Sequence, residues 1–155
     1  MQSKYYIFIF SIAIFILLGF LIEEPKLKDN NDNWGNKLSK EEYNVTRCGG
    51  TEPPFTGKYY KHDVDGTYNC NCCKNPLFSS EVKYDSGSGW PSFWDSVDKK
   101  NIKTKEDNSL GSKRIEIICA KCDAHLGHVF NDGPNPTGLR YCVNSLSLDF
   151  NDKGK

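Results

Sequence analysis

The chain has 155 residues, and its 20 basic and 20 acidic side chains cancel to a formal net charge of zero. This balance argues against a nucleic-acid partner, because surfaces that bind nucleic acid are dominated by basic residues. The seven cysteines cannot all pair in internal disulfides, since their number is odd. With 13% aromatic residues, 13 glycines and 7 prolines, the composition favours strands and turns over a helical bundle.

Residues 5–22, YYIFIFSIAIFILLGFLI, carry no charge. As a helix they would measure about 27 Å, close to the roughly 30 Å of a bilayer's hydrocarbon core. Residues 1–22 are therefore predicted to be an uncleaved signal anchor or a cleaved signal peptide, with a buried helix or a gene-model artefact as the alternatives. Lys4 before the segment and Glu23 after it favour a domain on the far side of the membrane. A membrane-anchored or secretory location, in the endoplasmic reticulum lumen or outside the cell, is expected.

The next residues, 23–38, are polar and rich in Asn and Asp, as is typical of a linker. Ser39 and Glu42 fit a capping box, which predicts that a short helix and the folded domain (residues 39–151) begin there. Asn44 opens an Asn-Val-Thr sequon, which a luminal domain could present for glycosylation.

Beyond this helix, turn signals recur every few residues and separate short segments of strand character. Residues 114–118 (RIEII) and 140–150 (RYCVNSLSLDF) are predicted strands. The charged residues 95–113 predict a helix or a surface loop. His62 lies outside every motif and is expected at the surface.

Two CxxC pairs stand well apart in the chain: Cys70 with Cys73, and Cys119 with Cys122. Each CxxC turn places two thiolates about one tetrahedral edge apart, so two such turns can complete a four-thiolate zinc site. Two disulfides in an oxidising compartment are one alternative, and a redox-active CxxC is another. No βαβ pattern surrounds either pair, so structural zinc is the favoured interpretation.

The segment RYCVNS alternates as a strand, so Arg140, Cys142 and Asn144 are predicted to project from one face. A guanidinium beside a thiol lowers the thiol pKa and favours the nucleophilic thiolate. The alternative is a buried structural cysteine flanked by solvated polar groups. These residues alone leave both interpretations open.

Four segments, taken in order, resemble the methionine-R-sulfoxide reductase family of the B type: CGGTEPPFTGKY, GSGWPSFW, CAKCDAHLGHVFNDGP and GLRYCVNSLSLDF. The resemblance covers about residues 41–150. It implies a mainly β fold of two antiparallel sheets (a β-tent) with a short N-terminal helix. It implies an enzyme that reduces the R epimer of methionine sulfoxide, peptide-bound or free, with thioredoxin or another thiol as reductant. By the same resemblance, Cys142 is the nucleophile, and a structural zinc is held far from the active site by Cys70, Cys73, Cys119 and Cys122.

Sulfoxide reduction needs a proton donor beside the thiolate, because the sulfoxide oxygen takes up a proton as its sulfur is attacked. His125 and His128 resemble the family's substrate-side histidines. Structural histidines or spare metal ligands are the alternatives. Asn144 would supply a further hydrogen bond, and Arg140 would hold the thiolate. Trp90 resembles the residue that packs against the methyl group of the substrate, the alternative being a core tryptophan.

Attack leaves a sulfenic acid on Cys142, which condenses with a second thiol. Many family members carry that second cysteine in the GxGWPSF turn, where this chain has Ser88. Cys48 is the expected resolving residue, since Gly49-Gly50 gives its segment freedom to move. Cys72, or direct reduction by a small thiol or thioredoxin, is the alternative.

Two other functions are compatible with parts of this pattern. One is a non-catalytic zinc-binding β-tent module, since a fold does not determine a function. The other is a secreted interaction domain stapled by disulfides. The reductase alone uses the thiol, the histidines, the asparagine and the tryptophan together, and it is the favoured function.

Overall fold

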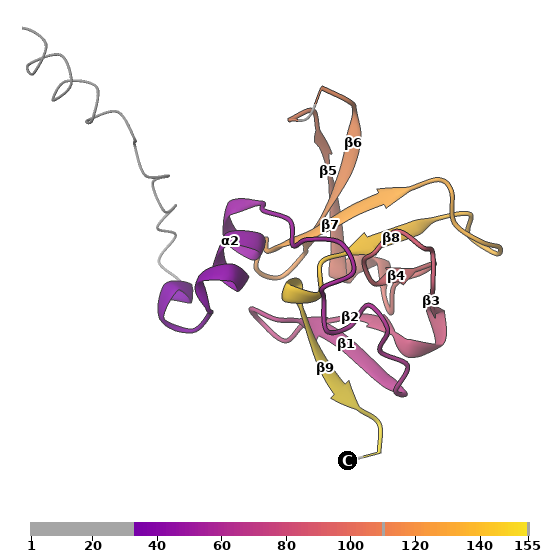
Figure 1. Cartoon of the computed structure of the whole chain (residues 1–155), viewed down its shortest axis with the longest axis horizontal. Helices are drawn as coiled ribbons and strands as arrows, with labels where there is room; N and C mark the ends of the chain where they lie inside the picture. Colours follow the sequence, from indigo (N-terminus) through magenta and orange to yellow (C-terminus); the bar gives the residue numbers. More distant parts are fainter. Residues whose placement is uncertain (1–32, 110, 155) are drawn as a thin grey trace, which may run out of the picture.

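The computed structural model describes residues 33–109 and 111–154, which form two antiparallel sheets, one short α-helix and four 3₁₀-helices (Figure 1). The predicted signal segment, residues 1–22, lies outside the described residues. Among those described, no helix combines the length and the apolar character that crossing a bilayer requires. The 3₁₀-helices are η1 (Trp34–Asn36), η2 (Ser80–Val82), η3 (Lys99–Asn101) and η4 (Ser145–Ser147).

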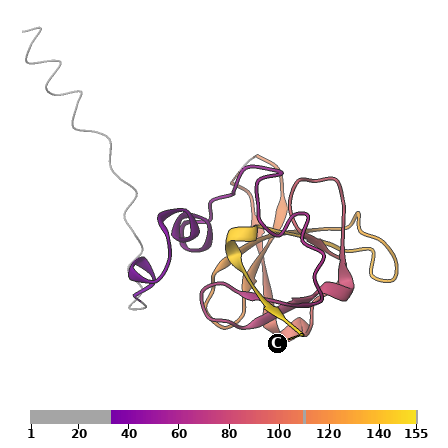
Figure 2. The ribbon, with the colours of Figure 1, turned by 60° about the horizontal axis from the view of Figure 1, so that its bottom comes forward.

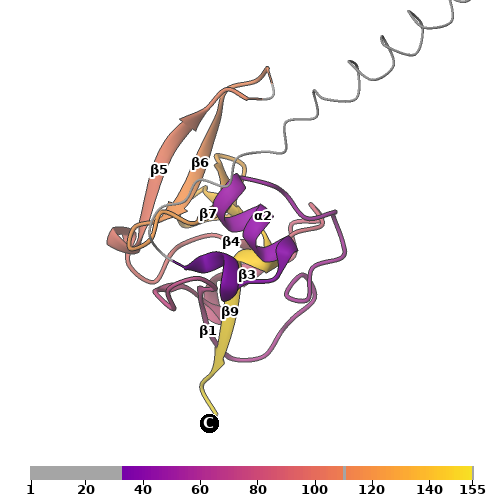
Figure 3. The same cartoon turned by 90° about the vertical axis from the view of Figure 1, so that its left-hand side faces the viewer.

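Helix α2 (Lys40–Cys48) begins at the predicted capping box. The Ser39 hydroxyl accepts the Glu42 backbone N–H at 3.2 Å, and the Glu42 carboxylate accepts the Ser39 backbone N–H at 2.8 Å. The helix ends because Gly49 adopts the left-handed conformation, with φ 73°. It packs against η4 and against strand β7 of the large sheet, as Figure 3 shows from the side. Cys48 is therefore the last helical residue.

The smaller sheet has the strand order β2-β1-β9. Along its central strand, side chains alternate between buried and half-buried, which is the period of a sheet with one face in the core. Seen from below, the strands of both sheets surround the interior (Figure 2). The three strands are β1 (Gly66–Cys70), β2 (Pro76–Ser79) and β9 (Leu148–Asp152).

The larger sheet has the order β3-β4-β8-β7-β6-β5. One of its faces packs on the small sheet, where Phe78 of β2 and Phe93 of β4 stack with ring centroids 4.4 Å apart. Burial of such side chains stabilises the fold by about 1.5–3 kcal/mol each. The prediction of two antiparallel sheets is confirmed. The strands are β3 (Lys83–Tyr84), β4 (Ser92–Phe93), β5 (Ile102–Asp107), β6 (Arg114–Cys119), β7 (His125–Phe130) and β8 (Arg140–Val143).

The prediction of a helix or surface loop over residues 95–113 is wrong for residues 102–107, which form β5. This strand lies at the sheet edge, and four of its six side chains are exposed. Backbone pairing with β6 stabilises this strand. Its sequence therefore does not need to alternate between apolar and polar residues, and it shows no such alternation. Edge strands of this kind carry charged side chains that discourage further strand pairing.

Residues 140–150 do not form one strand. β8 ends at Val143, η4 turns the chain, and β9 then joins the other sheet. The predicted surface position of His62 is only partly correct, because its side chain is half-buried. Its Nδ1 lies 2.8 Å from the Tyr68 hydroxyl, and its ring packs edge-on against Phe150 with centroids 4.3 Å apart. Aromatic packing of the small sheet therefore half-buries this histidine.

Candidate active site

The four cysteines of the two CxxC pairs come together although 45 residues separate the pairs along the chain (Cys73 to Cys119 with both excluded). Their sulfur atoms all lie within 4.8 Å of one another. The Sγ atoms of Cys70 and Cys122 are 3.6 Å apart, and those of Cys73 and Cys119 are 3.5 Å apart. Sulfurs around a tetrahedral zinc, with Zn–S near 2.3 Å, are about 3.8 Å apart. The four cysteine sulfurs therefore fit a metal site with soft ligands, and this arrangement disfavours two separate disulfide bonds.

Both CxxC turns are built alike. The Lys74 N–H donates to the Cys70 carbonyl at 2.8 Å, and the Asp123 N–H donates to the Cys119 carbonyl at 2.9 Å. Lys74 and Asp123 both adopt positive φ, 59° and 56°. Each turn thus bends its backbone sharply just after its second cysteine and directs two thiols to one point.

The metal-site turns also hold helix α2. The Arg47 guanidinium donates to the Cys122 carbonyl at 2.7 Å, and the Asn71 amide donates to the Glu42 carboxylate at 2.9 Å. One bond comes from each end of the helix, and each reaches a different CxxC turn. The position of Cys48 at the end of α2 consequently depends on the folded cysteine cluster.

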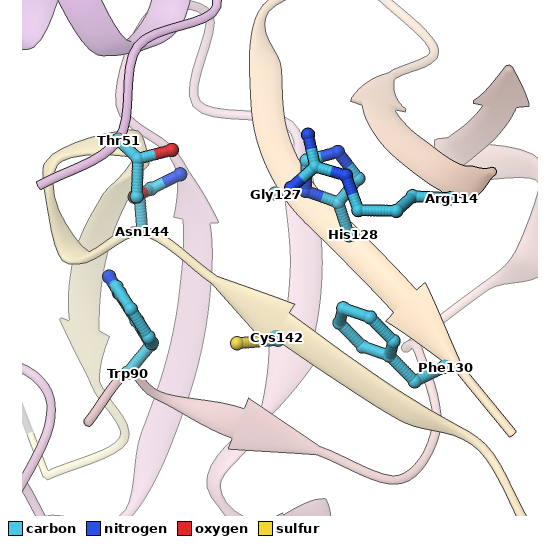
Figure 4. Close-up of a pocket in the computed structure, with 8 residues that line it drawn as sticks. All are labelled: Thr51, Trp90, Arg114, Gly127, His128, Phe130, Cys142 and Asn144. Atoms are coloured by element: carbon cyan, nitrogen blue, oxygen red, sulfur yellow. The ribbon is translucent and has the colours of Figure 1, made fainter. Parts of the chain in front are cut away.

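Cys142 lies on the opposite, polar face of the large sheet, in an open cleft of about 120 Å³. In the sheet it pairs with His128 of β7 and Ser92 of β4, so these three side chains share a face. Figure 4 shows its sulfur directed toward the Trp90 side of the cleft. The cleft is lined by Thr51, Trp90, Arg114, Gly127, His128, Phe130, Cys142 and Asn144.

Only glycine permits the close approach of β7 to β8 beside the thiol. Gly127 has φ 151°, and a Cβ at this position would lie 2.0 Å from the Cys142 carbonyl oxygen. Any other side chain would push the strand that carries the histidines away from the cysteine.

Two opposing effects act on the Cys142 thiol. Burial is the largest of these effects and raises the pKa of the thiol above its usual value, and the Ser88 hydroxyl and the Arg140 guanidinium offset only part of this rise by stabilising the thiolate. The Ser88 Oγ lies 3.8 Å from the Cys142 sulfur and accepts a hydrogen bond from Ser86 at 2.9 Å. Arg140 is fixed by two bonds of 2.9 Å to Asp132. Arg140 therefore acts by charge without lining the cleft.

A β-bulge brings the two histidines to one face. Residues three apart on a regular strand point to opposite faces, but here Gly127 pairs with Ile117 and His125 pairs with Ile118. The residue between them, Leu126, is the extra one, and it reverses the alternation. The rings of His125 and His128 consequently lie 5.6 Å apart. His128 lines the cleft, whereas His125 does not and instead lines a separate pocket beside the C-terminal end of α2.

Each histidine is oriented by a carboxylate from another strand of the sheet, Glu116 from the adjacent β6 and Asp107 from β5 beyond it. His125 Nδ1 lies 2.7 Å from Glu116, and His128 Nε2 lies 2.8 Å from Asp107. Burial lowers the pKa of His128, against the opposing effect of Asp107. The Nε2 of His125 is buried and has no hydrogen-bond partner among the described residues. Neither histidine belongs to the cysteine cluster.

Trp90 and Asn144 are both tied to Glu52. The Trp90 indole N–H donates to the Glu52 carbonyl at 3.1 Å, and the Asn144 side-chain oxygen accepts the Glu52 N–H at 3.2 Å. The Glu52 carboxylate, 4% exposed, accepts the backbone N–H groups of Ser145 and Leu146 at 2.6 and 3.0 Å. Burial raises the pKa of this carboxyl. Trp90 lines the cleft and is half-buried.

Sequence reasoning missed Arg114, Asp107, Glu116 and Glu52. Arg114 and Glu116 were recoverable, because residues two apart in the predicted strand RIEII share a face. Asp107 was not recoverable, since it lies in β5, within a region predicted to be a helix or a surface loop. The role of Glu52 depends on contacts with residues more than 90 positions away.

Cys48 is exposed, and Cys72 is buried beside the metal cluster. Thr51, three residues after Cys48, lines the cleft, so the Cα of Cys48 lies at most about 11 Å from that wall. All the cysteines are free thiols in this structure. Cys48 is therefore tethered near the cleft without touching Cys142.

The model of the SelR domain matches residues 38–152. A "peptide methionine sulfoxide reductase MsrB" of Synechococcus sp. (strain RCC307) is 58% identical over 132 residues, 85% of this chain and 96% of its own. One from Thioalkalivibrio sulfidiphilus is 63% identical over 114 residues, 74% and 83% of the two chains. "Methionine-R-sulfoxide reductase B2, mitochondrial" of Danio rerio is 54% identical, covering 82% of this chain and 74% of its own.

Proposed function

The chain belongs to the SelR domain family of methionine-R-sulfoxide reductases, and we propose that Cys142 is the nucleophile with which it reduces the R epimer of methionine sulfoxide. The observation that carries this proposal is the position of Cys142. Its thiol lies in the cleft lined by Trp90 and His128, where Ser88 and Arg140 oppose the effect of burial and favour the thiolate. The thiolate attacks the sulfoxide sulfur, and the oxygen, with one proton, passes to the cysteine. Methionine leaves, and Cys142 is oxidised to the sulfenic acid.

The proton comes from the histidine pair. His128 lies on the cleft wall, where Asp107 fixes its ring, and the ring of His125 lies 5.6 Å from it, with an Nε2 that has no hydrogen-bond partner among the described residues. Burial lowers the pKa of His128, and the Asp107 carboxylate opposes this effect by favouring the imidazolium that a general acid requires. Trp90 packs against the methyl group of the substrate, and Asn144 holds the segment that positions Trp90.

We expect His125→Ala and His128→Ala each to slow reduction by roughly 10²-fold or more, because each variant removes one member of the histidine pair that supplies the proton. Both variants should keep one metal ion per chain. The measurement is the rate on a blocked methionine-R-sulfoxide, together with metal content. His62→Ala is the matched control, since it removes the same ring outside the cleft. Loss of metal in either active-site variant would show that the histidines are ligands instead.

Cys48 resolves the sulfenic acid. Its sulfur attacks the Cys142 sulfur, the sulfenic hydroxyl leaves as water with the proton of the Cys48 thiol, and a Cys48–Cys142 disulfide forms, which a thioredoxin-type dithiol then reduces. Disulfide formation requires Cα atoms within about 7 Å, so the Gly49-Gly50 segment must move toward β8. The exposure of Cys48 and its short tether to Thr51 support this step.

Cys48→Ser should still release one equivalent of methionine per enzyme, because the first step uses Cys142 alone. It should then stall as sulfenic acid with thioredoxin as sole reductant and recover in part with a small thiol. Peptide mapping of the oxidised wild type tests the pairing directly, with Cys72→Ser as control. A Cys142–Cys72 disulfide, or no disulfide on Cys142, would refute the assignment.

The metal held by Cys70, Cys73, Cys119 and Cys122 is zinc in this proposal. Bound by four thiolates, zinc has no open position, and its contribution is to stabilise the fold. The sulfur spacing supports a tetrahedral ion of this kind.

We also propose that residues 5–22 direct the domain to the secretory pathway, as a membrane anchor or as a cleaved signal. The support for this is their uncharged apolar sequence. N-terminal sequencing of the mature protein, after separation of membrane and soluble fractions, distinguishes the two. A mature cytosolic protein that starts at Met1 would contradict both.

A further inference from the structure

The loop that follows Thr51 carries an aromatic side chain that the reaction does not use. Phe55 is 61% exposed, and the other exposed large apolar side chains of the described residues, Val64 and Val97, are aliphatic. A singly exposed apolar residue needs no explanation by itself. The backbone of Phe55, however, marks it as unusual.

Phe55 adopts φ 66°, in the left-handed region that bulky residues rarely occupy. Such strain persists only where the surroundings enforce it, and it clusters at functional sites. Here the Phe55 N–H donates to the Gly89 carbonyl at 2.7 Å. A Cβ on Gly89 would lie 2.7 Å from Pro54 Cβ and 3.0 Å from Phe55 N, so the two segments touch closely.

The segment that holds Phe55 is the one that carries Trp90. Gly89 immediately precedes Trp90, and the Trp90 indole N–H is bonded to the carbonyl of Glu52, three residues before Phe55. The loop that carries the exposed ring is therefore bonded at two points to the segment that forms the Trp90 wall of the cleft. Tyr60 supports the Phe55 ring from one side, edge-on, with ring centroids 5.4 Å apart.

We propose that Phe55, backed by Tyr60, is a subsite that contacts an apolar side chain next to the oxidised methionine of a polypeptide substrate. The inference rests on the proposed function. A methionine sulfoxide that enters the cleft from within a peptide leaves its flanking residues on the rim, where the Phe55 loop is attached. A rigid, preorganised aromatic ring on that rim binds a flanking apolar side chain at little entropic cost.

The test compares kcat/KM, with dithiothreitol as reductant, on three R-sulfoxide substrates: a blocked single residue, a pentapeptide with leucine on both sides of the methionine, and the same peptide with serine. The wild type should prefer the leucine peptide over the serine peptide by about tenfold, the size expected for partial burial of an aliphatic side chain. Phe55→Ala should lose this preference. Phe55→Leu should recover part of it, and Val97→Ala, an exposed apolar control, should retain all of it.

A preference that persists in Phe55→Ala, or that is absent from the wild type, would overturn the inference. So would an effect of Phe55→Ala that appears only when thioredoxin replaces dithiothreitol, because the ring would then be a docking site for the reductant. Failure of the wild type to reduce any of the three substrates would instead refute the proposed function, and the inference with it.

Discussion

Cys142→Ser is expected to reduce turnover of methionine-R-sulfoxide to below about 1% of the wild-type value, because a serine hydroxyl is not ionised at neutral pH and cannot replace the thiolate. The fold and the metal content should be unchanged. Serine is nearly isosteric with cysteine, and Cys142 lies outside the four-sulfur cluster. The measurement is steady-state reduction with dithiothreitol, with metal analysis on the same preparation.

Cys48→Ser is the matched control for this variant, because it removes the other cysteine near the cleft. In a single turnover without reductant, it should release one equivalent of methionine, whereas Cys142→Ser should release none. If Cys142→Ser retained more than a few per cent of turnover, another nucleophile would have to be assigned.

The second large effect is expected at the cysteine cluster. Cys70→Ser should lose the metal and unfold at a much lower temperature, since the binding free energy of a structural metal contributes directly to folding. A chelator should shift the wild type in the same direction. Cys72→Ser is the control, because it removes a cysteine of the same CxxC turn that is not part of the cluster. The measurements are metal content and the midpoint of thermal unfolding.

Metal loss should also affect resolution of the sulfenic acid. Arg47 and Asn71 tie α2 to the two CxxC turns, so a loosened cluster releases the helix that ends at Cys48. A metal-free preparation that is equally stable and fully active with thioredoxin would contradict this account of the cluster.

Local patterns predicted the elements that depend on local contacts. The capping box of Ser39 and Glu42 was visible because both partners lie within one helical turn. The two CxxC turns were visible because each is a closed local structure with its own ligands. The strand character of RIEII between turn signals correctly identified β6.

Features that depend on distant partners were not predictable in this way. β5 is stabilised by pairing with β6 and shows no alternation of its own. The shared face of His125 and His128 depends on the bulge at Leu126, which simple alternation does not reveal. Asp107 contacts His128 only because the sheet brings β5, β6 and β7 together.

The central claim, reduction of the R epimer through Cys142, is tested most directly by a turnover assay on the resolved R and S sulfoxides of a blocked methionine. The assay is run with dithiothreitol and then with thioredoxin as the reductant. We expect the wild type to reduce the R epimer with both reductants and to leave the S epimer at the background rate. Reduction of the S epimer at a comparable rate, or of neither epimer, would contradict the account.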